Sequence, residues 1–176
     1  MFRPTENIFN IKQGEFRVSS HPDDRFFCVL GSCIATVFFD PVARIGGMNH
    51  FLLPGRDPSA TGEVKYGAHA MEQLVNALLQ AGAAKNRLEV SLFGGAKVIR
   101  TSSAIGANNA RFAQDFVRQE GFRLKDVDVG GTFGRRLGFL PATGVAQRDI
   151  LHDQAAVPSA VPRAQPPRPT GSIELF

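Results

Sequence analysis

The chain has 176 residues, a formal net charge of +4 and a sequence pI of about 9.5. This length is typical of one domain that buries enough apolar surface to fold without disulfides or metal. Hydrophobic residues make up 43% of the chain and charged residues 20%, which excludes a wholly disordered protein, and no apolar run of about 18 residues indicates a membrane-spanning helix.

The N-terminal third is predicted to contain four strands. Residues 1–14 are expected to be an irregular lead-in. The N-terminus lacks the basic-then-apolar pattern of a signal peptide, so a cytosolic protein is expected. Apolar and β-branched runs predict strands at residues 15–18, 26–30, 34–39 and 45–53. Gly31-Ser32-Cys33 interrupts the second and third strands, and residues 54–64 are expected to form a polar loop.

Two amphipathic helices are predicted in the middle of the chain. Apolar residues at helical spacing predict one over residues 66–81 and a second over residues 108–120. Alternation predicts strands at residues 88–92 and 122–129, the latter with a bulge near Asp126. A hairpin is expected from residues 136–140 and 145–150, around a turn at residues 141–144.

The C-terminal segment differs in composition from the rest. Residues 153–176 are rich in proline, so we expect a flexible tail after a folded domain at residues 1–152. Its apolar end at residues 173–176 is either a docking motif or part of a frayed tail. The order of strands and helices lacks strict alternation and favours an α+β fold with mainly antiparallel sheets.

The two cysteines, Cys28 and Cys33, are not expected to form a disulfide in a reducing cytosol. The four histidines show no metal-ligand spacing with them, so no metal site is expected. Each cysteine is then either a small buried hydrophobe or a nucleophile, and a nucleophile requires a nearby histidine.

Cys33 lies at a turn that could present its side chain. Gly31 allows a sharp turn, and the backbone N–H groups near Ser32 and Cys33 could stabilise an oxyanion.

The hairpin after Cys33 places His50 relative to it. A two-residue loop would pair Asp40 with Ala43 and oppose Cys33 directly to His50. Pro41 disfavours that turn, so a four-residue loop that pairs Asp40 with Ile45 is expected, with His50 a diagonal neighbour of Cys33. Both loops put the thiol and the imidazole on one face, whereas a three-residue loop would separate them.

This proximity would matter chemically, because a neighbouring His can lower the pKa of a thiol by several units. His50 could instead be a core histidine.

Other candidate sites are weaker. Gly94-Gly95 is interpreted as a pair of tight-turn glycines, because no Walker loop follows. Asp40, Asp126 and Asp128 are either acids that orient a histidine or solvated turn carboxylates. Arg135-Arg136, with neighbouring phenylalanines, could bind nucleic acid, but basic residues elsewhere are scattered among acidic ones, so no nucleic-acid partner is expected.

Several motifs match one family in order. They are Leu30-Gly31-Ser32-Cys33, Asp40-Pro41, the run of residues 46–54 that contains His50, Lys65-Tyr66-Gly67, Phe93-Gly94-Gly95-Ala96, residues 105–109, and Asp128-Val129-Gly130-Gly131 with Arg135-Arg136. Over about residues 10–150 the chain resembles the CheD family of chemoreceptor glutamine deamidases.

This resemblance implies a protein-glutamine deamidase that converts glutamines on the cytoplasmic helices of methyl-accepting chemotaxis receptors to glutamate. It implies Cys33 as nucleophile and His50 as base, and this chemistry requires no metal or cofactor. The absence of a long apolar run predicts no membrane insertion. The implied fold is an α+β sandwich of two sheets packed face to face with helices outside, similar to deamidating toxins. Some members also bind a CheC-type phosphatase of the response regulator.

One position departs from the family pattern. Phe27 or Cys28 stands where the family usually has a Thr as third catalytic member, so a backbone carbonyl or another side chain must orient His50. Two alternatives remain open: a binding module that mainly engages a CheC-type phosphatase, and a receptor methylesterase that uses the same acyl-enzyme.

Overall fold

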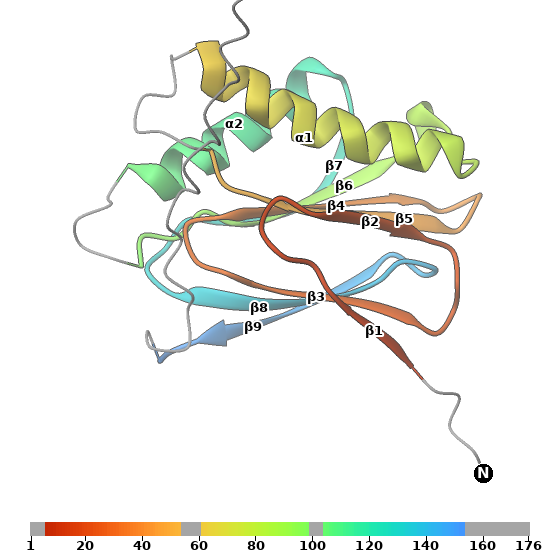
Figure 1. The fold of residues 1–176 in the computed structure, drawn as a ribbon, viewed down its shortest axis with the longest axis horizontal. Helices are drawn as coiled ribbons and strands as arrows, with labels where there is room; N and C mark the ends of the chain where they lie inside the picture. Colours follow the sequence, from red (N-terminus) through yellow and green to blue (C-terminus); the bar gives the residue numbers. More distant parts are fainter. Residues whose placement is uncertain (1–5, 54–60, 99–103, 154–176) are drawn as a thin grey trace, which may run out of the picture.

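The structure, a computed structural model, describes residues 6–53, 61–98 and 104–153. It has three layers: two helices cover one face of a five-stranded sheet, and a four-stranded sheet packs against the other face (Figure 1). The expected α+β arrangement of two mixed, mainly antiparallel sheets with helices outside is therefore confirmed. The expected flexible tail lies outside the described residues, apart from its first residue, Asp153.

The described elements are nine strands, two α-helices and one short 3-10 helix. The strands are β1 (Asn7–Asn10), β2 (Phe16–Ser19), β3 (Asp24–Leu30), β4 (Ile34–Asp40), β5 (Ile45–Phe51), β6 (Glu89–Gly94), β7 (Arg123–Val129), β8 (Gly134–Leu140) and β9 (Val145–Leu151). The helices are α1 (Thr61–Gln80), a short 3-10 helix (Lys85–Arg87) and α2 (Ile105–Gln119). The five-stranded sheet has the order β2-β5-β4-β6-β7 and the four-stranded sheet the order β1-β3-β8-β9.

The β4–β5 hairpin has the four-residue loop expected from the sequence. Asp40 pairs with Ile45 and Ala35 with His50. The carboxylate of Asp40 stabilises the turn, since Oδ1 accepts hydrogen bonds from the backbone N–H groups of Val42 (2.9 Å) and Ala43 (3.0 Å). The register that brings Cys33 and His50 to one face is thus confirmed.

Two apolar cores separate the three layers. The core under the helices contains Met71, Leu74 and Leu78 of α1 and Ala113 and Val117 of α2, all buried against the five-stranded sheet. The core between the sheets is built from these residues: Ile11, Phe26, Cys28, Leu30, Cys33, Ala35, Val37, Met48, Leu52, Phe93, Leu137 and Phe139. Cys28 is therefore a small buried core residue, which is one of the two interpretations of each cysteine that the sequence left open. Cys33 belongs to the same core.

The structure corrects the expected element boundaries, most clearly at the N-terminus and at the start of the first helix; α2 also begins three residues earlier than expected, at Ile105. Residues 1–14 are not an irregular lead-in throughout, because Asn7–Asn10 form β1, parallel to β3. The first helix begins at Thr61, five residues before its expected start, so the expected polar loop can extend only over residues 54–60, which lie outside the described residues. The bulge is confirmed, since the β6–β7 register skips Lys125, next to Asp126.

Candidate active site

Cys33 lies in the bend between β3 and β4, where it is only 4% exposed. Two backbone hydrogen bonds from the segment after β6 hold this bend: Gly95 N–H donates to the carbonyl oxygen of Cys33 (2.8 Å), and Ala96 N–H donates to that of Gly31 (2.9 Å). The nucleophile candidate is thus fixed by a segment more than 60 residues away in the chain.

Gly94 allows this close approach of two backbones. Its φ is +112°, and a Cβ atom there would lie 2.1 Å from the carbonyl oxygen of Cys33. Gly94 and Gly95 both have the positive φ that glycine favours (+112° and +62°), but they lie at the end of β6 and directly after it rather than in an assigned tight turn, and from there they support Cys33.

Asn109 of α2 is a site residue that the sequence reasoning did not single out. Its Nδ2 donates to the carbonyl oxygen of Ser32 (2.8 Å), and its Oδ1 accepts from the backbone N–H of Leu53 (2.9 Å). This fully buried side chain therefore joins the Cys33 bend to the chain just after β5. One signal could have revealed it: Asn109 falls on the same helical face as the buried Ala113 and Val117, where an amide needs partners.

His50 projects from β5 into the cavity that Cys33 also lines. This cavity has a volume of about 490 Å³ and is lined by these residues: Ile8, Asn10, Ile11, Lys12, Gln13, Phe27, Cys28, Val29, Gly31, Cys33, His50 and Arg136. The structure therefore brings together Cys33, His50 and Gly31, and places Phe27 and Cys28 at the wall.

The backbone carbonyl of Ile11 orients the imidazole. Nδ1 of His50 lies 3.0 Å from this oxygen, which can only accept, so Nδ1 carries the proton. Nε2 is then the bare acceptor, and it is buried without a hydrogen-bond partner among the described residues. Ile11 is itself fixed, because its N–H donates to the carbonyl oxygen of Phe27 (2.8 Å).

Burial keeps both groups neutral in this state. It raises the pKa of the Cys33 thiol to about 12, although the residue's own backbone N–H opposes the shift. It also lowers the pKa of His50, against the opposing effects of the Ile11 carbonyl and the Glu15 carboxylate. The lowered thiol pKa that a neighbouring His can produce is therefore not found here. Cys33 and His50 are a neutral thiol and a neutral imidazole that line one cavity, and Nε2 of His50 is not hydrogen-bonded to the thiol.

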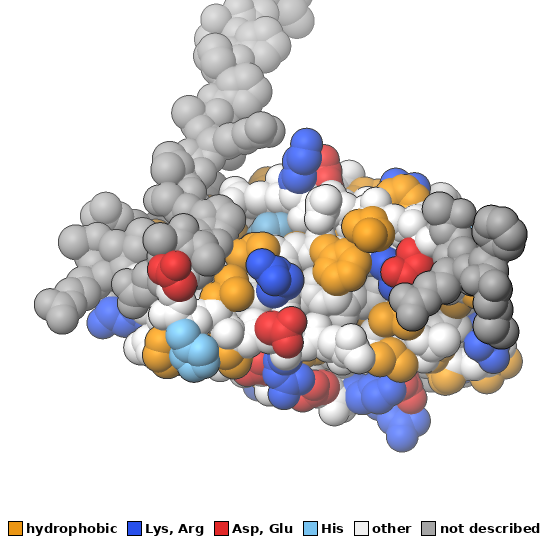
Figure 2. Space-filling view, turned by 90° about the horizontal axis from the view of Figure 1, so that it is seen from below, with side chains coloured by type: hydrophobic (Ala, Val, Ile, Leu, Met, Phe, Trp, Pro, Cys, Tyr) orange, Lys and Arg blue, Asp and Glu red, His pale blue; other side chains and the backbone are white. Residues whose placement is uncertain are grey.

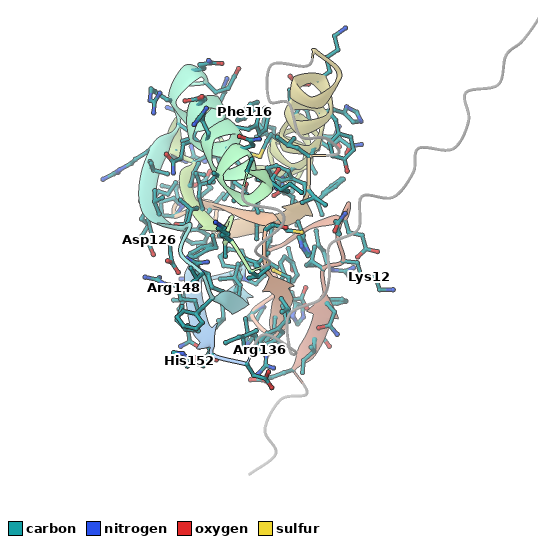
Figure 3. The ribbon with its side chains drawn as sticks, turned by 90° about the vertical axis from the view of Figure 1, so that its left-hand side faces the viewer. Lys12, Phe116, Asp126, Arg136, Arg148 and His152 are labelled. Atoms are coloured by element: carbon teal, nitrogen blue, oxygen red, sulfur yellow. The ribbon has the colours of Figure 1, made fainter. Side chains whose placement is uncertain are left out.

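The acidic candidates do not orient His50. Asp40 is fully buried and accepts hydrogen bonds from Arg87 (2.8–3.1 Å). Burial opposes its ionisation, but Arg87 and three backbone N–H groups hold its pKa well below the usual range. Asp126 and Asp128 pair with Arg148, and Figure 3 shows Asp126 and Arg148 together, on the opposite side of the molecule from Lys12.

The arginine pair does not form a basic patch. Arg135 is 5% exposed and binds Asp128 (3.0 and 3.1 Å) and the carbonyl oxygen of Gly130 (2.9 Å). Arg136 is exposed and lines the cavity that Cys33 and His50 share. On the face shown in Figure 2, basic side chains lie among acidic and apolar ones.

Within the described residues, no group of three His, Cys, Asp or Glu side chains is placed to hold a metal ion. No helix among those residues has the length and apolar character needed to cross a membrane.

Comparison with known proteins gives one consistent family. The family model described as CheD chemotactic sensory transduction matches residues 52–149, more than half of the chain, although both Cys33 and His50 precede this segment. A protein of Jannaschia sp. named "Probable chemoreceptor glutamine deamidase CheD" is 50% identical over 171 residues, which cover 97% of this chain and 95% of the relative.

Proteins of the same name show similar agreement in other bacteria. The one from Cereibacter sphaeroides is 42% identical over 97% of this chain and 85% of its own, and the one from Rhizobium leguminosarum bv. trifolii is 46% identical over 95% of each. Among solved structures, Neisseria meningitidis protein NMB0706 aligns with a TM-score of 0.48 and 9% identity, over 72% of this chain and 64% of that chain.

Proposed function

The chain belongs to the CheD family, and we propose that it hydrolyses side-chain amides of chemoreceptor glutamines to glutamate, with Cys33 as nucleophile and His50 as base. The names of its relatives support the substrate and reaction, and the cavity shared by Cys33 and His50 supports the residue roles. The proposed catalytic domain comprises residues 1–152, and the proposed site of action is the cytoplasm.

The observation that carries the residue assignment is the bare Nε2 of His50. A buried ring nitrogen without a partner is unfavourable, so it calls for an explanation, and a catalytic role is one of the recognised ones. Nδ1 is occupied by the Ile11 carbonyl, so Nε2 is free to take a proton inside the cavity that holds the thiol.

The first half of the reaction forms a thioester. Nε2 of His50 takes the proton from Sγ of Cys33 as the sulfur attacks the amide carbon of the substrate glutamine. The C–O double bond opens to an oxyanion, which the backbone N–H groups near Ser32 and Cys33 stabilise, with Gly31 giving the bend its shape. The imidazolium then donates its proton to the leaving nitrogen, the C–N bond breaks, and ammonia departs.

The second half returns the enzyme to its starting state. Neutral His50 takes a proton from water as the water oxygen attacks the thioester carbon. The C–S bond then breaks and the sulfur regains the proton from His50. The carboxylic acid product loses its own proton to water, so it leaves as glutamate, with one more negative charge than glutamine.

The decisive experiment is mass spectrometry of a receptor cytoplasmic fragment after incubation with the protein. We expect a shift of about +1 Da at specific glutamines and release of ammonia. Cys33→Ala should abolish both, whereas Cys28→Ala, which removes the other buried thiol, should retain them. Deamidation by Cys33→Ala would refute the assignment.

The same assay separates the two alternatives. A methylesterase would release methanol from methylated receptor glutamates, and both reactions could use one acyl-enzyme. A module that mainly engages a CheC-type phosphatase would bind that protein tightly and leave the receptor mass unchanged.

A further inference from the structure

The turn between β1 and β2 is fixed directly against the catalytic histidine. Gly14 N–H donates to the carbonyl oxygen of His50 (2.7 Å), and His50 N–H donates to that of Glu15 (3.1 Å). Lys12 N–H donates to the Glu15 carboxylate (2.9 Å), which closes the turn. The residue at the centre of this turn, Gln13, is therefore held in a defined position.

The side chain of Gln13 reaches the nucleophile. Sγ of Cys33 donates to Oε1 of Gln13 at 3.6 Å, and both side chains line the cavity that also contains His50. Gln13 is half-buried, so this contact is partly shielded from water. A carboxamide thus touches the atom on which negative charge forms during the reaction.

A carboxamide can serve both forms of the sulfur. Its oxygen accepts from a thiol, and its NH₂ group donates to a thiolate. The last torsion of a glutamine is broad and roughly two-fold, so exchanging oxygen for nitrogen requires only rotation about that bond. Hydrogen bonds to a charged acceptor are stronger than those to a neutral one, so the donating orientation is favoured once the proton has left Sγ.

We propose that Gln13 is a third catalytic side chain: its carboxamide accepts from the Cys33 thiol in the resting enzyme and, after rotation, donates Nε2–H to the thiolate. The proton removed from Sγ goes to Nε2 of His50, and Gln13 forms and breaks hydrogen bonds only. This inference rests on the proposed function for its catalytic role, but the contact itself is independent of any substrate.

The environment of Cys33 disfavours its ionised form, and a donor to the sulfur would oppose this effect. Burial raises the pKa of its thiol to about 12, which opposes formation of the thiolate. A hydrogen bond donated to the ionised form lowers a pKa and offsets part of this effect. The charged side chains that line the cavity among the described residues are Lys12 and Arg136, and the side chain that contacts Sγ is that of Gln13.

The test is the rate of alkylation of Cys33 by iodoacetamide across pH 7–10, followed by tandem mass spectrometry. Cys28 is an internal reference, since burial raises the pKa of its thiol to about 12 as well. Gln13→Met keeps the length and removes the amide, Gln13→Asn withdraws it from Sγ, and Gln13→Glu replaces the donor with a carboxylate. Gln119→Met on α2 is the matched control at an exposed site.

We expect Cys33 in Gln13→Met and Gln13→Asn to react about tenfold more slowly than in the parent protein, and in Gln13→Glu about a hundredfold more slowly. Cys28 and the Gln119→Met protein should keep their parent rates. Equal or faster alkylation of Cys33 in Gln13→Met would show that Gln13 only obstructs the thiol, and would overturn the proposal.

Two further outcomes are informative. A +1 Da change at Gln13 that requires Cys33 would make Gln13 an internal substrate and would also overturn the proposal. A parent protein that leaves receptor fragments unchanged but shows the expected alkylation rates would refute the proposed function and keep the thiolate-donor role of Gln13.

Discussion

The carbonyl oxygen of Ile11 lies 3.0 Å from Nδ1 of His50 and so determines which ring nitrogen carries the proton. The expected Thr is replaced by Phe27 or Cys28, and the structure assigns the orienting role to a backbone group instead. A backbone carbonyl fixes the tautomer as a hydroxyl would, since the imidazole needs only an acceptor at Nδ1. The parallel pairing of β1 with β3 brings that carbonyl to the site.

The pH dependence of deamidation should reflect the depressed pKa of His50. Burial lowers this pKa from its ordinary value of 6.5, and the base must be neutral to act. The rate should therefore fall on acidification with a midpoint below pH 6.5, while the Cys33 thiol, with a pKa raised to about 12, adds no titration step of its own between pH 5 and 8. Rates of ammonia release from a receptor fragment between pH 5 and 8 test this, and a midpoint above pH 7 would contradict it.

The same shift makes the folded state sensitive to acid. A histidine whose pKa is lower in the folded than in the unfolded chain binds fewer protons when folded, so it stabilises the fold above pH 6.5 and loses this effect as the pH falls through its folded pKa. The free energy of unfolding in urea should decrease from pH 7 to pH 5. In His50→Gln this decrease should be smaller, and an equal decrease would assign it to other groups.

The sequence predicts that Cys33 and His50 lie on one face because the relevant signals are local. Asp40-Pro41 and the two flanking apolar runs specify a hairpin, and the loop length then determines the face on which His50 lies. The sequence does not predict β1, because Asn7–Asn10 (Asn-Ile-Phe-Asn) is only four residues long and does not alternate, and this edge strand pairs with β3, 17 residues away. The role of Ile11 is also invisible, because every residue carries a carbonyl group.

Gly94→Ala should destabilise the protein and inactivate it. A φ of +112° disfavours any residue with a Cβ atom. The new atom would also lie 2.1 Å from the carbonyl oxygen of Cys33, so the bend that carries Cys33 must move. We expect a loss of about 3 kcal/mol or more in the free energy of unfolding. Gly121→Ala, at φ +72° with open space around the Cβ, is the control and should lose only about 1 kcal/mol. Equal losses in urea unfolding would show that the Cys33 contact is unimportant.

Asn109→Ala should lower activity by displacing the bend between β3 and β4 that carries Cys33. The substitution leaves the carbonyl of Ser32 and the N–H of Leu53 buried without their partner, at a cost of about 2–4 kcal/mol in the free energy of unfolding. Because the bend carries Cys33, kcat should fall by about tenfold or more while KM changes little. Asn76→Ala, at an exposed position of α1, should alter neither. An Asn109→Ala protein with parental kcat would limit Asn109 to a role in stability.

Cys28→Thr tests whether the missing hydroxyl matters. Cys28 is 6% exposed in the core between the sheets, and Nδ1 of His50 already has the Ile11 carbonyl as its acceptor. A hydroxyl at this position would therefore find Nδ1 already engaged in its hydrogen bond to the Ile11 carbonyl. The hydroxyl would also need a hydrogen-bond partner of its own in an apolar core. We expect deamidation rates within about threefold of the parent and a free energy of unfolding lower by about 1 kcal/mol. A tenfold gain in kcat would mean that the Ile11 carbonyl orients His50 only partly, and that a side-chain acceptor from β3 completes the site.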